Sequence, residues 1–241
     1  MTLSVTRNPR NLQKNCSAYQ YQIDDYFDFP EVTSLLNDLG KSRLFCTLLK
    51  KAVLLEWEQF DLVKSIDGRA ACQDDARSFF IYRTAQYVAF PEVLLDGAVE
   101  ALEHAQQNGK NLIAEKYARM MCLSSPEEYK RMVCGNLDQP SQVKKQVLDE
   151  IYQILKEQLL LAKQTLPVTH HHARPDTTLT NHISSLDYFI AELVPFRLGS
   201  LFSLVDALSD MTKRGHNPIV RTYIFTMRVM QAVEGRLSNE L

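Results

Sequence analysis

Glycine and proline are scarce in this sequence of 241 residues, which contains eight glycines and nine prolines. Strict alternation of apolar and polar residues is almost absent as well, and this argues against a chain built from strands and tight turns. Apolar residues instead recur at helical spacing along nearly the whole chain, and they make up 45% of it, an ordinary share for a globular protein. The sequence therefore predicts an all-α fold, a single-domain bundle of about eight or nine helices.

The sequence also lacks an excess of charge and a long apolar run. Its formal net charge is −2 and its pI is near 6.3, which argues against a surface for nucleic acid or for an anionic membrane. No stretch of about 18 apolar residues is present, so no transmembrane helix is predicted. The first residues, MTLSVTRNPRNLQKNC, lack the apolar segment of a secretory signal. We therefore expect a cytoplasmic protein.

Cysteine is present but without a pairing pattern. The chain has an odd number of cysteines, and none forms a C-x-x-C pair: Cys16, Cys46, Cys72, Cys122 and Cys134. A disulfide framework or a thiolate zinc site is not expected from this arrangement. Reduced thiols that pack as small apolar side chains are the prediction.

The chain divides into a leader and a single helical domain. Residues 1–18 are polar and predicted to be mobile, and residues 19–241 are predicted to form the domain. Pro30 and Pro91 stand where helices are expected to begin, and Gly109 where one is expected to end. The main irregularity is PVTHHHARPDTTLTNH, residues 167–182, which we predict to be a loop and a candidate lid.

Ionisable side chains fall inside the apolar arcs of three predicted helices. On a helical wheel with 100° per residue, Glu56 lies within the apolar stripe of its helix. Arg83 and Gln86 lie on either side of Phe79 on the apolar arc of a second helix, and Lys116 lies inside the arc of a third. Two further polar residues of the third helix, Asn111 and Glu115, lie on the flank beside Lys116.

Buried ions without partners cost several kcal/mol, so these charges are expected to meet in the interior. Two interpretations remain open. The charges could form buried salt bridges that fix the register of the helices. They could instead line a polar pocket that receives a ligand, as sites in helical bundles often do.

Two other segments carry candidate chemistry. In IDGRAACQDD, Cys72 is predicted just ahead of a helix N-terminus, whose partial positive charge lowers the pKa of a thiol. It is either a nucleophile or a packed thiol in a turn. His170, His171 and His172 are consecutive, so their rings cannot easily share one metal ion, and no Glu-x-x-His pair accompanies them. A metal site and a solvated loop both remain open for this segment.

The runs EWEQF, DGRAACQDD, NGKNLIAEKYARMM and SSPEEY resemble the core of a bacterial family known as domain of unknown function, number 4125. The resemblance covers roughly residues 50–130, and SSLDYFIAEL is a weaker echo near 184–193. The family's polar positions fall here on Glu56, Gly68, Arg69, Cys72, Gln73, Arg83, Gln86, Asn111, Glu115, Lys116, Tyr117, Tyr129, Tyr188 and Glu192. The resemblance implies no activity or cofactor. The chain departs from the family pattern at Phe90, where tryptophan is usual, and after Glu192.

These observations lead to a first hypothesis of function. We expect an enzyme that acts on a small polar or anionic metabolite of specialised bacterial biosynthesis by cofactor-independent acid/base or imine chemistry. The catalytic candidates are Glu56, Cys72, Glu115, Lys116 and Tyr117. The substrate-binding candidates are Arg69, Gln73, Arg83, Gln86, Asn111, Tyr188 and Glu192.

Two alternatives belong to other classes. The first is a helical binding or regulatory module that recognises a metabolite or a partner helix without chemistry. The second is a metal- or haem-dependent oxygenase that uses the histidine segment. No metal ligand and no cofactor is predicted, although metal and haem remain open, and so does a homodimer.

Overall fold

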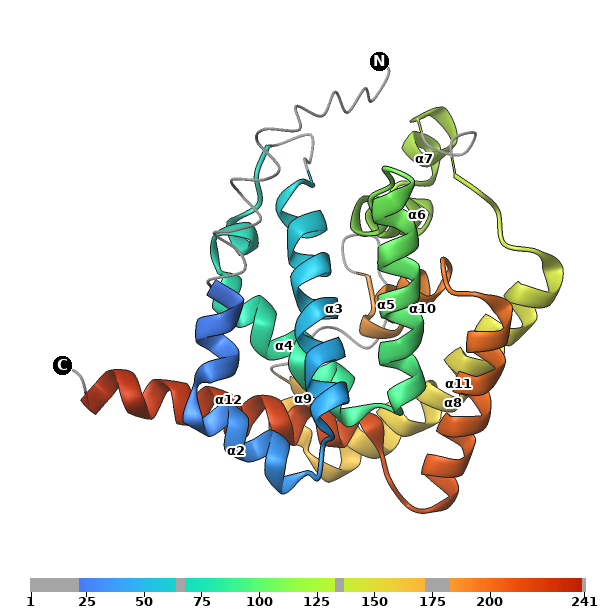
Figure 1. Ribbon diagram of the computed structural model, residues 1–241. Coiled ribbons are helices and arrows are strands. Elements are labelled where there is room, and N and C mark those ends of the chain that lie inside the picture. The colour runs from blue at the N-terminus through green and yellow to red at the C-terminus, as the bar shows by residue number, and fades with distance from the viewer. Residues whose placement is uncertain (1–21, 64–67, 133–136, 172–182, 240–241) are drawn as a thin grey trace.

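The computed structural model describes residues 22–63, 68–132, 137–171 and 183–239 (Figure 1). After a helical stretch at 22–28, the elements are α2 (Pro30–Asp38), α3 (Arg43–Asp61), η1 (Ala71–Asp74), α4 (Ala76–Ala89), α5 (Glu92–Gln107), α6 (Leu112–Ser124), α7 (Pro126–Met132), α8 (Gln142–Thr165), α9 (Pro167–His171), α10 (Ser185–Leu193), α11 (Leu198–Lys213) and α12 (Pro218–Asn239).

The predicted all-α fold is confirmed, and the described ranges contain no strand. The helices outnumber the eight or nine predicted because short elements such as η1, α7 and α9 lie between the long ones. One boundary needs correction. Residues 167–171, predicted to begin the irregular loop, form α9, whereas residues 172–182 of that predicted loop and the predicted leader at 1–18 lie outside the described residues.

Side-chain caps begin several of the helices. The side-chain oxygens of Ser42, Asp75, Asn111, Ser141 and Ser184 each accept a hydrogen bond from a backbone N–H in the first turn of α3, α4, α6, α8 and α10, respectively. Such bonds satisfy amides that have no partner within the helix. The helix starts are therefore set by local sequence, and this positions the side chains that follow.

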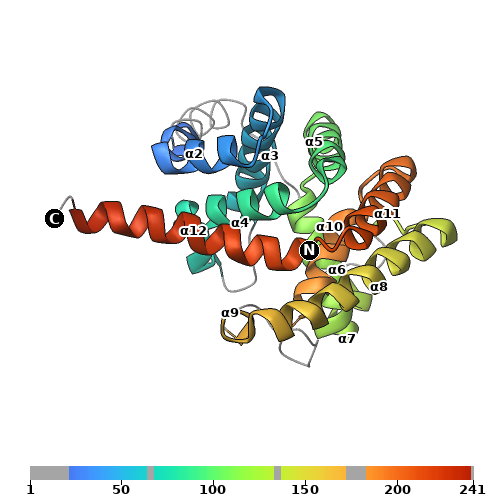
Figure 2. The ribbon, with the colours of Figure 1, turned by 90° about the horizontal axis from the view of Figure 1, so that it is seen from below.

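Helix α3 runs through the middle of the molecule, and α4, α5 and α6 all pack against it. Helix α12, at the bottom of Figure 1, lies alongside α4, as the view from below in Figure 2 also shows. Helices α8 and α11 pack together on the side of the molecule away from α2, and α10 contacts both α6 and α8. One region of the molecule is thus surrounded by four helices from different parts of the chain: α3, α4, α6 and α10.

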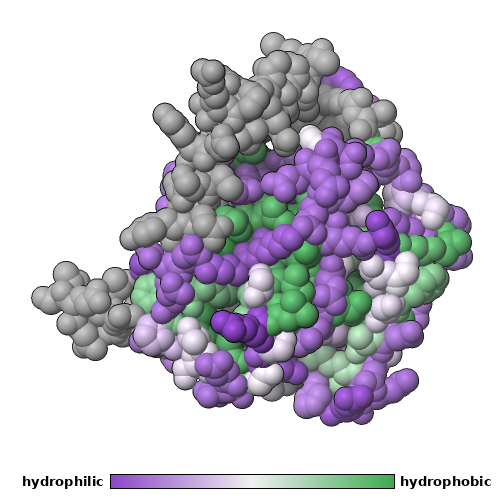
Figure 3. Space-filling view, in the orientation of Figure 1, coloured by the Kyte–Doolittle hydropathy of each residue, from purple (hydrophilic) through white to green (hydrophobic). Residues whose placement is uncertain are grey.

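Aromatic rings fill the contact between α3 and α4. Trp57 is buried, and its ring centroid lies 5.1 Å from that of Phe79. Phe60 stacks on Phe79 at 5.2 Å, and Phe80 meets Trp57 edge-on at 5.7 Å. Ring contacts of this kind hold the two helices at a fixed separation. Outside this core, hydrophilic residues cover much of the face seen in Figure 3, and apolar residues show between them.

A glycine on α5 permits a close approach by the segment that joins α10 to α11. A Cβ built on Gly97 would lie 2.5 Å from Cε2 and 2.6 Å from Cδ2 of the Phe196 ring. Phe196 is buried, so its ring has little room to retreat. The absence of a side chain at Gly97 therefore lets the segment 194–197 lie directly on α5.

Among the described residues, none of the helices combines the length and the apolarity that crossing a bilayer requires.

Candidate functional site

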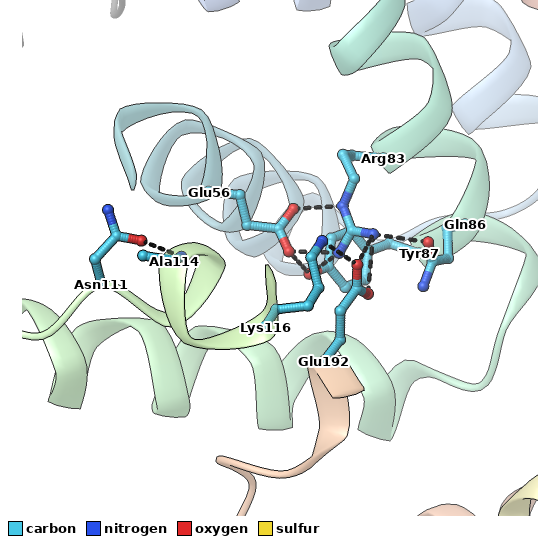
Figure 4. Close-up of polar contacts among 8 residues, drawn as sticks. All are labelled: Glu56, Arg83, Gln86, Tyr87, Asn111, Ala114, Lys116 and Glu192. Atoms are coloured by element: carbon cyan, nitrogen blue, oxygen red, sulfur yellow. Dashed lines mark hydrogen bonds and ion pairs between the residues drawn. The ribbon is translucent and has the colours of Figure 1, made fainter. Parts of the chain in front are cut away.

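Four ionisable side chains from four helices meet in one group (Figure 4). Glu56 comes from α3, Arg83 from α4, Lys116 from α6 and Glu192 from α10. We call these four residues the charge cluster. The helical wheels placed Glu56, Arg83 and Lys116 on the apolar arcs of their helices. The structure brings these three side chains together and adds Glu192 as the fourth member.

Arg83 and Glu56 form the innermost pair. Nε of Arg83 donates to Oε2 of Glu56 at 2.6 Å, and Nη2 donates to the other carboxylate oxygen, so that the pair is bidentate. The hydroxyl of Tyr87 donates to Oε1 of Glu56 at 2.7 Å and accepts from Nη2 of Arg83 at 3.1 Å. This geometry fixes the plane of the guanidinium.

Glu192 holds both cations of the cluster. Its carboxylate oxygens lie 3.2 and 3.1 Å from Nη1 of Arg83, and Oε1 accepts from Nζ of Lys116 at 2.9 Å. Nη1 of Arg83 also donates to Oε1 of Gln86 at 2.8 Å. Two carboxylates thus face two cations, and the cluster as a whole is electrically neutral.

The charge cluster is largely buried, but each of its side chains keeps some exposure to solvent. The exposed fraction of the side chain is 6% for Glu56, 14% for Arg83, 11% for Lys116 and 18% for Glu192. Bulk solvent therefore does not surround these charges. Exposure is lowest at Glu56 and highest at Glu192, so the accessible side of the cluster is the one at Glu192 on α10.

Burial and the neighbouring charges shift the pKa values of the cluster residues and of Tyr87. Burial by itself raises the pKa of Glu192, but the nearby charges of Arg83 and Lys116 outweigh it and lower the pKa to about 2. Burial, followed by the charge of Glu56, raises the pKa of Tyr87 well above its usual value. Burial works against the charged form of Arg83, yet Glu192 and Glu56 hold its pKa well above the ordinary value. At neutral pH, Glu192 is therefore ionised and Tyr87 is a neutral phenol.

Two tyrosines flank Lys116 on the accessible side. The rings of Tyr117 and Tyr188 meet edge to face at 6.4 Å, and both are partly exposed. Nζ of Lys116 lies 5.3 Å from the Tyr117 ring centroid and 5.9 Å from the Tyr188 ring centroid. An ammonium at such distances is attracted by the negative faces of aromatic rings. Lys116 and the two rings therefore form one contact group between α6 and α10.

Arg69 and Gln73 lie outside the cluster and tie a loop to the end of α3. Nε2 of Gln73 donates to the backbone carbonyl oxygens of Phe60 at 2.7 Å and Val63 at 3.0 Å. Arg69 donates from Nε to Asp74 at 2.8 Å and from Nη2 to the Gln73 carbonyl at 2.6 Å. Gln73 therefore ties η1 to backbone carbonyl groups at and just after the C-terminus of α3.

Three more predicted site residues lie apart from the charge cluster. Cys72 is exposed on η1. Asn111 caps α6, and its Nδ2 donates to the backbone oxygen of Gln59 at 2.7 Å. Glu115 lies 3.9 Å from Arg119, four residues further along α6, and both line a different pocket. The structure thus assigns Asn111 a local structural contact and places Glu115 in other surroundings.

The histidine segment is only partly described. His170 and His171 belong to α9, and Nδ1 of His170 lies 3.2 Å from the hydroxyl oxygen of Tyr223. His172 lies outside the described residues. Within the described ranges, no three His, Cys, Asp or Glu side chains are grouped so that they could hold a metal ion.

Sequence reasoning missed Tyr87 and Gln59. Tyr87 lies four residues after Arg83 on the same face of α4, so the wheel that selected Arg83 could have selected its neighbour as well. Gln59 is buried, and its Oε1 accepts from the backbone N–H of Leu112 at 2.6 Å. Polar residues one turn from a predicted buried charge were the available signal.

A comparison with sequence families finds one whose description is "Protein of unknown function (DUF4125)", and its match spans residues 46–232 of the 241. This range includes every member of the charge cluster. Comparisons with curated proteins and with solved structures found no match.

Proposed function

The chain belongs to the DUF4125 family, whose function is unknown, and from that premise we propose that it is an enzyme acting on a small anionic metabolite without a cofactor. The ligand would lie beside Lys116, Tyr117 and Tyr188. The observation that carries the proposal is the sharing of one carboxylate, that of Glu192, by Arg83 and Lys116. The cytoplasmic location and the bacterial source predicted from the sequence belong to the same proposal.

Because Arg83 and Lys116 share the carboxylate of Glu192, the site would be suited to recognise an anion. Glu192 divides its negative charge between two cations, and it is the most exposed member of the cluster. A ligand carboxylate or phosphate could approach the ammonium while Arg83 remains held by Glu56. Charge-assisted hydrogen bonds of this kind are roughly twice as strong as neutral ones. The rings of Tyr117 and Tyr188 would add apolar contact area and hydroxyl donors.

The same geometry supports proton transfer on the bound ligand. When a carbon next to a carbonyl or carboxylate gives its proton to the ionised carboxylate of Glu192, negative charge builds on the oxygen of the ligand. A fixed ammonium such as Lys116 stabilises that charge most effectively in a site with little water. Glu56 and Tyr87 would act as positioning residues because they hold Arg83 from the buried side. Cys72 and Glu115, placed elsewhere, take no part in this proposal.

One observation favours binding without chemistry as a second candidate. The cluster is neutral, and a carboxylate with a pKa of about 2, as in Glu192, is a weak base at neutral pH. A preformed ionic network of this kind could recognise a metabolite without converting it. The experiment must therefore separate binding from turnover.

We would screen the full chain by differential scanning calorimetry against a panel of small carboxylic acids, amino acids and phosphate monoesters. Compounds that raise Tm would then be incubated with the protein in D2O and followed by proton NMR. Enzymatic proton transfer predicts incorporation of deuterium into the ligand. The Lys116→Met variant should bind at least about tenfold more weakly and lose the exchange.

The matched control is Lys156→Met, which removes the same charge from an exposed position on α8. It should leave both readouts unchanged. Binding without any deuterium exchange would establish the second candidate and exclude the enzyme. A Lys116→Met variant that melts earlier but binds and exchanges normally would show that the cluster serves only to hold the helices together.

A further inference from the structure

A pocket lined by charged residues lies on a flank of α6 adjacent to the one that carries Lys116. It has a volume of about 270 Å³ and is bounded by α5, α6, the N-terminus of α8 and the segment 194–197. Lys116 points from α6 toward the cluster, whereas Arg119, less than one turn away, lines the pocket. The two sites therefore use adjacent flanks of one helix and share no lining residue.

Positive charge is in excess around this pocket. Its lining includes four cations and three carboxylates, namely Lys110, Arg119, Lys144, Arg197, Glu100, Glu115 and Asp138. Two of the carboxylates are already engaged, since Asp138 pairs with Lys110 at 3.0 Å and Glu100 pairs with Arg197 at 2.7 Å. The third, Glu115, is no closer than 3.9 Å to Arg119. Arg119 and Lys144 are thus the least compensated charges of the lining.

Both of these cations make their short hydrogen bonds to neutral groups. Nζ of Lys144 donates to the backbone oxygen of Val194 at 2.9 Å, and Nη2 of Arg119 donates to the backbone oxygen of Asp138 at 2.8 Å. Nε of Arg119 is buried without a hydrogen-bond partner among the described residues. Burial, and after it the charge of Arg119, lowers the pKa of Lys144, which shows that the two cations repel each other. An anion between them would relieve that repulsion.

The backbone adds to this charge. Helix α8 is 24 residues long and begins after its N-cap Ser141, and Lys144 of its first turn lines the pocket. The N-terminus of such a helix carries a partial positive charge, which favours anions nearby. The volume lies just below the range of sites for drug-sized ligands, so a small group fits it better than a large one.

We propose that this pocket binds a small oxyanion of the phosphate class, either free or as the end group of a phosphorylated metabolite, between Lys144 and Arg119 at the start of α8. A guanidinium and an ammonium beside a helix N-terminus are the groups that proteins use for phosphate. This site is separate from the charge cluster and does not depend on the proposed enzymatic function.

The test uses the full chain with two probes, inorganic phosphate and glycerol 3-phosphate. Each is titrated by isothermal titration calorimetry in chloride buffers of matched ionic strength. We expect at least one probe to bind, and we expect Lys144→Met to weaken it by about tenfold or more. The preference between the probes tells free phosphate from a phosphorylated metabolite.

Three further variants make the result decisive. Lys145→Met removes the same charge from the next position of α8, which is exposed and does not line the pocket, and it should bind as the wild type does. Arg119→Lys should weaken binding while retaining the charge, because it loses the planar fork of the guanidinium. Lys116→Met should retain the binding that Lys144→Met loses, which separates this pocket from the charge cluster.

Three outcomes would overturn the proposal. The first is an absence of heat and of any rise in Tm with either probe at 20 mM, far above the concentration that a built phosphate site needs. The second is equal loss of binding in Lys144→Met and Lys145→Met, which would show diffuse attraction by the surface. The third is loss of binding in Lys116→Met with retention in Lys144→Met. The melting temperature of each variant without probe shows whether it is folded.

Discussion

The guanidinium of Arg83 donates from Nη1 to both carboxylate oxygens of Glu192, at 3.2 and 3.1 Å, although the two residues are 109 positions apart. This contact joins α4 to α10 and extends the pair of Arg83 with Glu56 into a chain of alternating charges that ends at Lys116. Removing one link of such a chain leaves a charge without its partner. Most of the predictions below follow from this relationship.

Replacing Glu192 with glutamine should destabilise the protein strongly. The side chain keeps its size but loses its charge, so Arg83 and Lys116 are left with the single carboxylate of Glu56. Breaking a shielded ion pair in this way costs about 3 kcal/mol of unfolding free energy. Urea denaturation followed by circular dichroism measures the change. The control is Glu150→Gln, on the exposed face of α8, which should change stability by less than about 0.5 kcal/mol. Equal, small effects of the two substitutions would show that the cluster contributes little to stability.

The same carboxylate should make stability depend on pH. The pKa of Glu192 falls from an ordinary 4.5 to about 2 in the folded protein. A carboxylate with a lowered folded pKa stabilises the fold above its unfolded pKa, and this contribution is lost as pH falls through the window from 4.5 to 2. Between pH 5.5 and 3.5 the loss from this group is about 1 kcal/mol.

The measurement is the difference in unfolding free energy between the wild type and Glu192→Gln at both pH values. Because the variant lacks this titrating group, other carboxylates affect both proteins alike and cancel in the difference. The stability advantage of the wild type should therefore shrink on acidification. A constant or growing difference would mean that Glu192 is not held in its charged form by Arg83 and Lys116.

Replacing Tyr87 with phenylalanine should also weaken the cluster. The hydroxyl donates to Glu56 and accepts from Arg83, and the side chain is almost fully buried. Its removal leaves a buried carboxylate short of one donor, at a cost of about 2 kcal/mol. Thermal unfolding by calorimetry reports the change. Tyr82→Phe removes the same hydroxyl from an exposed position on α4 and should be close to neutral. Similar losses in the two variants would contradict the role given to the Tyr87 hydroxyl.

Replacing Gly97 with alanine should be destabilising, although alanine is the better helix former. The new Cβ would meet the buried ring of Phe196 at about 2.5 Å, which forces α5 or the segment 194–197 to move. Such overpacking costs about 1 to 3 kcal/mol, against a gain of about 1 kcal/mol in helix propensity.

The control for this substitution is Gly199→Ala, in the first turn of α11, where a Cβ has nothing within 4 Å. It should be neutral or slightly stabilising in the same denaturation experiment. The pair compares one substitution in two helices and isolates the contact with Phe196. A stabilised Gly97→Ala variant would show that the ring moves aside without cost.

The all-α fold and part of the cluster were accessible from the sequence because both depend on periodicity. Helical spacing predicted the long helices, and the cost of burying an ion predicted that Glu56, Arg83 and Lys116 would meet. Glu192 could be selected only through the family resemblance, since its partner Arg83 is far away in the sequence. Which helices pack together depends on contacts between distant parts of the chain, and a helical wheel of one segment gives no information about them.

The rest of the candidate site could not be assigned from the sequence for a related reason. Gln73 and Asn111 are polar residues close to helix ends, and the structure shows them bonded to backbone groups of α3 and α6. From the sequence alone, a polar side chain that caps a helix cannot be distinguished from one that binds a ligand. Tyr87 was overlooked for the opposite reason, because an aromatic residue on an apolar arc is typical of a core.

The aromatic contact between α3 and α4 has a practical consequence. Trp57 is the only tryptophan of the chain, it is buried, and it directly follows Glu56 in the sequence. Its fluorescence therefore originates in the contact between α3 and α4, which the pair of Glu56 and Arg83 also joins, and it carries no background from other indoles. A shift in its emission maximum on addition of a metabolite gives an unlabelled optical reporter of events at Glu56 and Arg83.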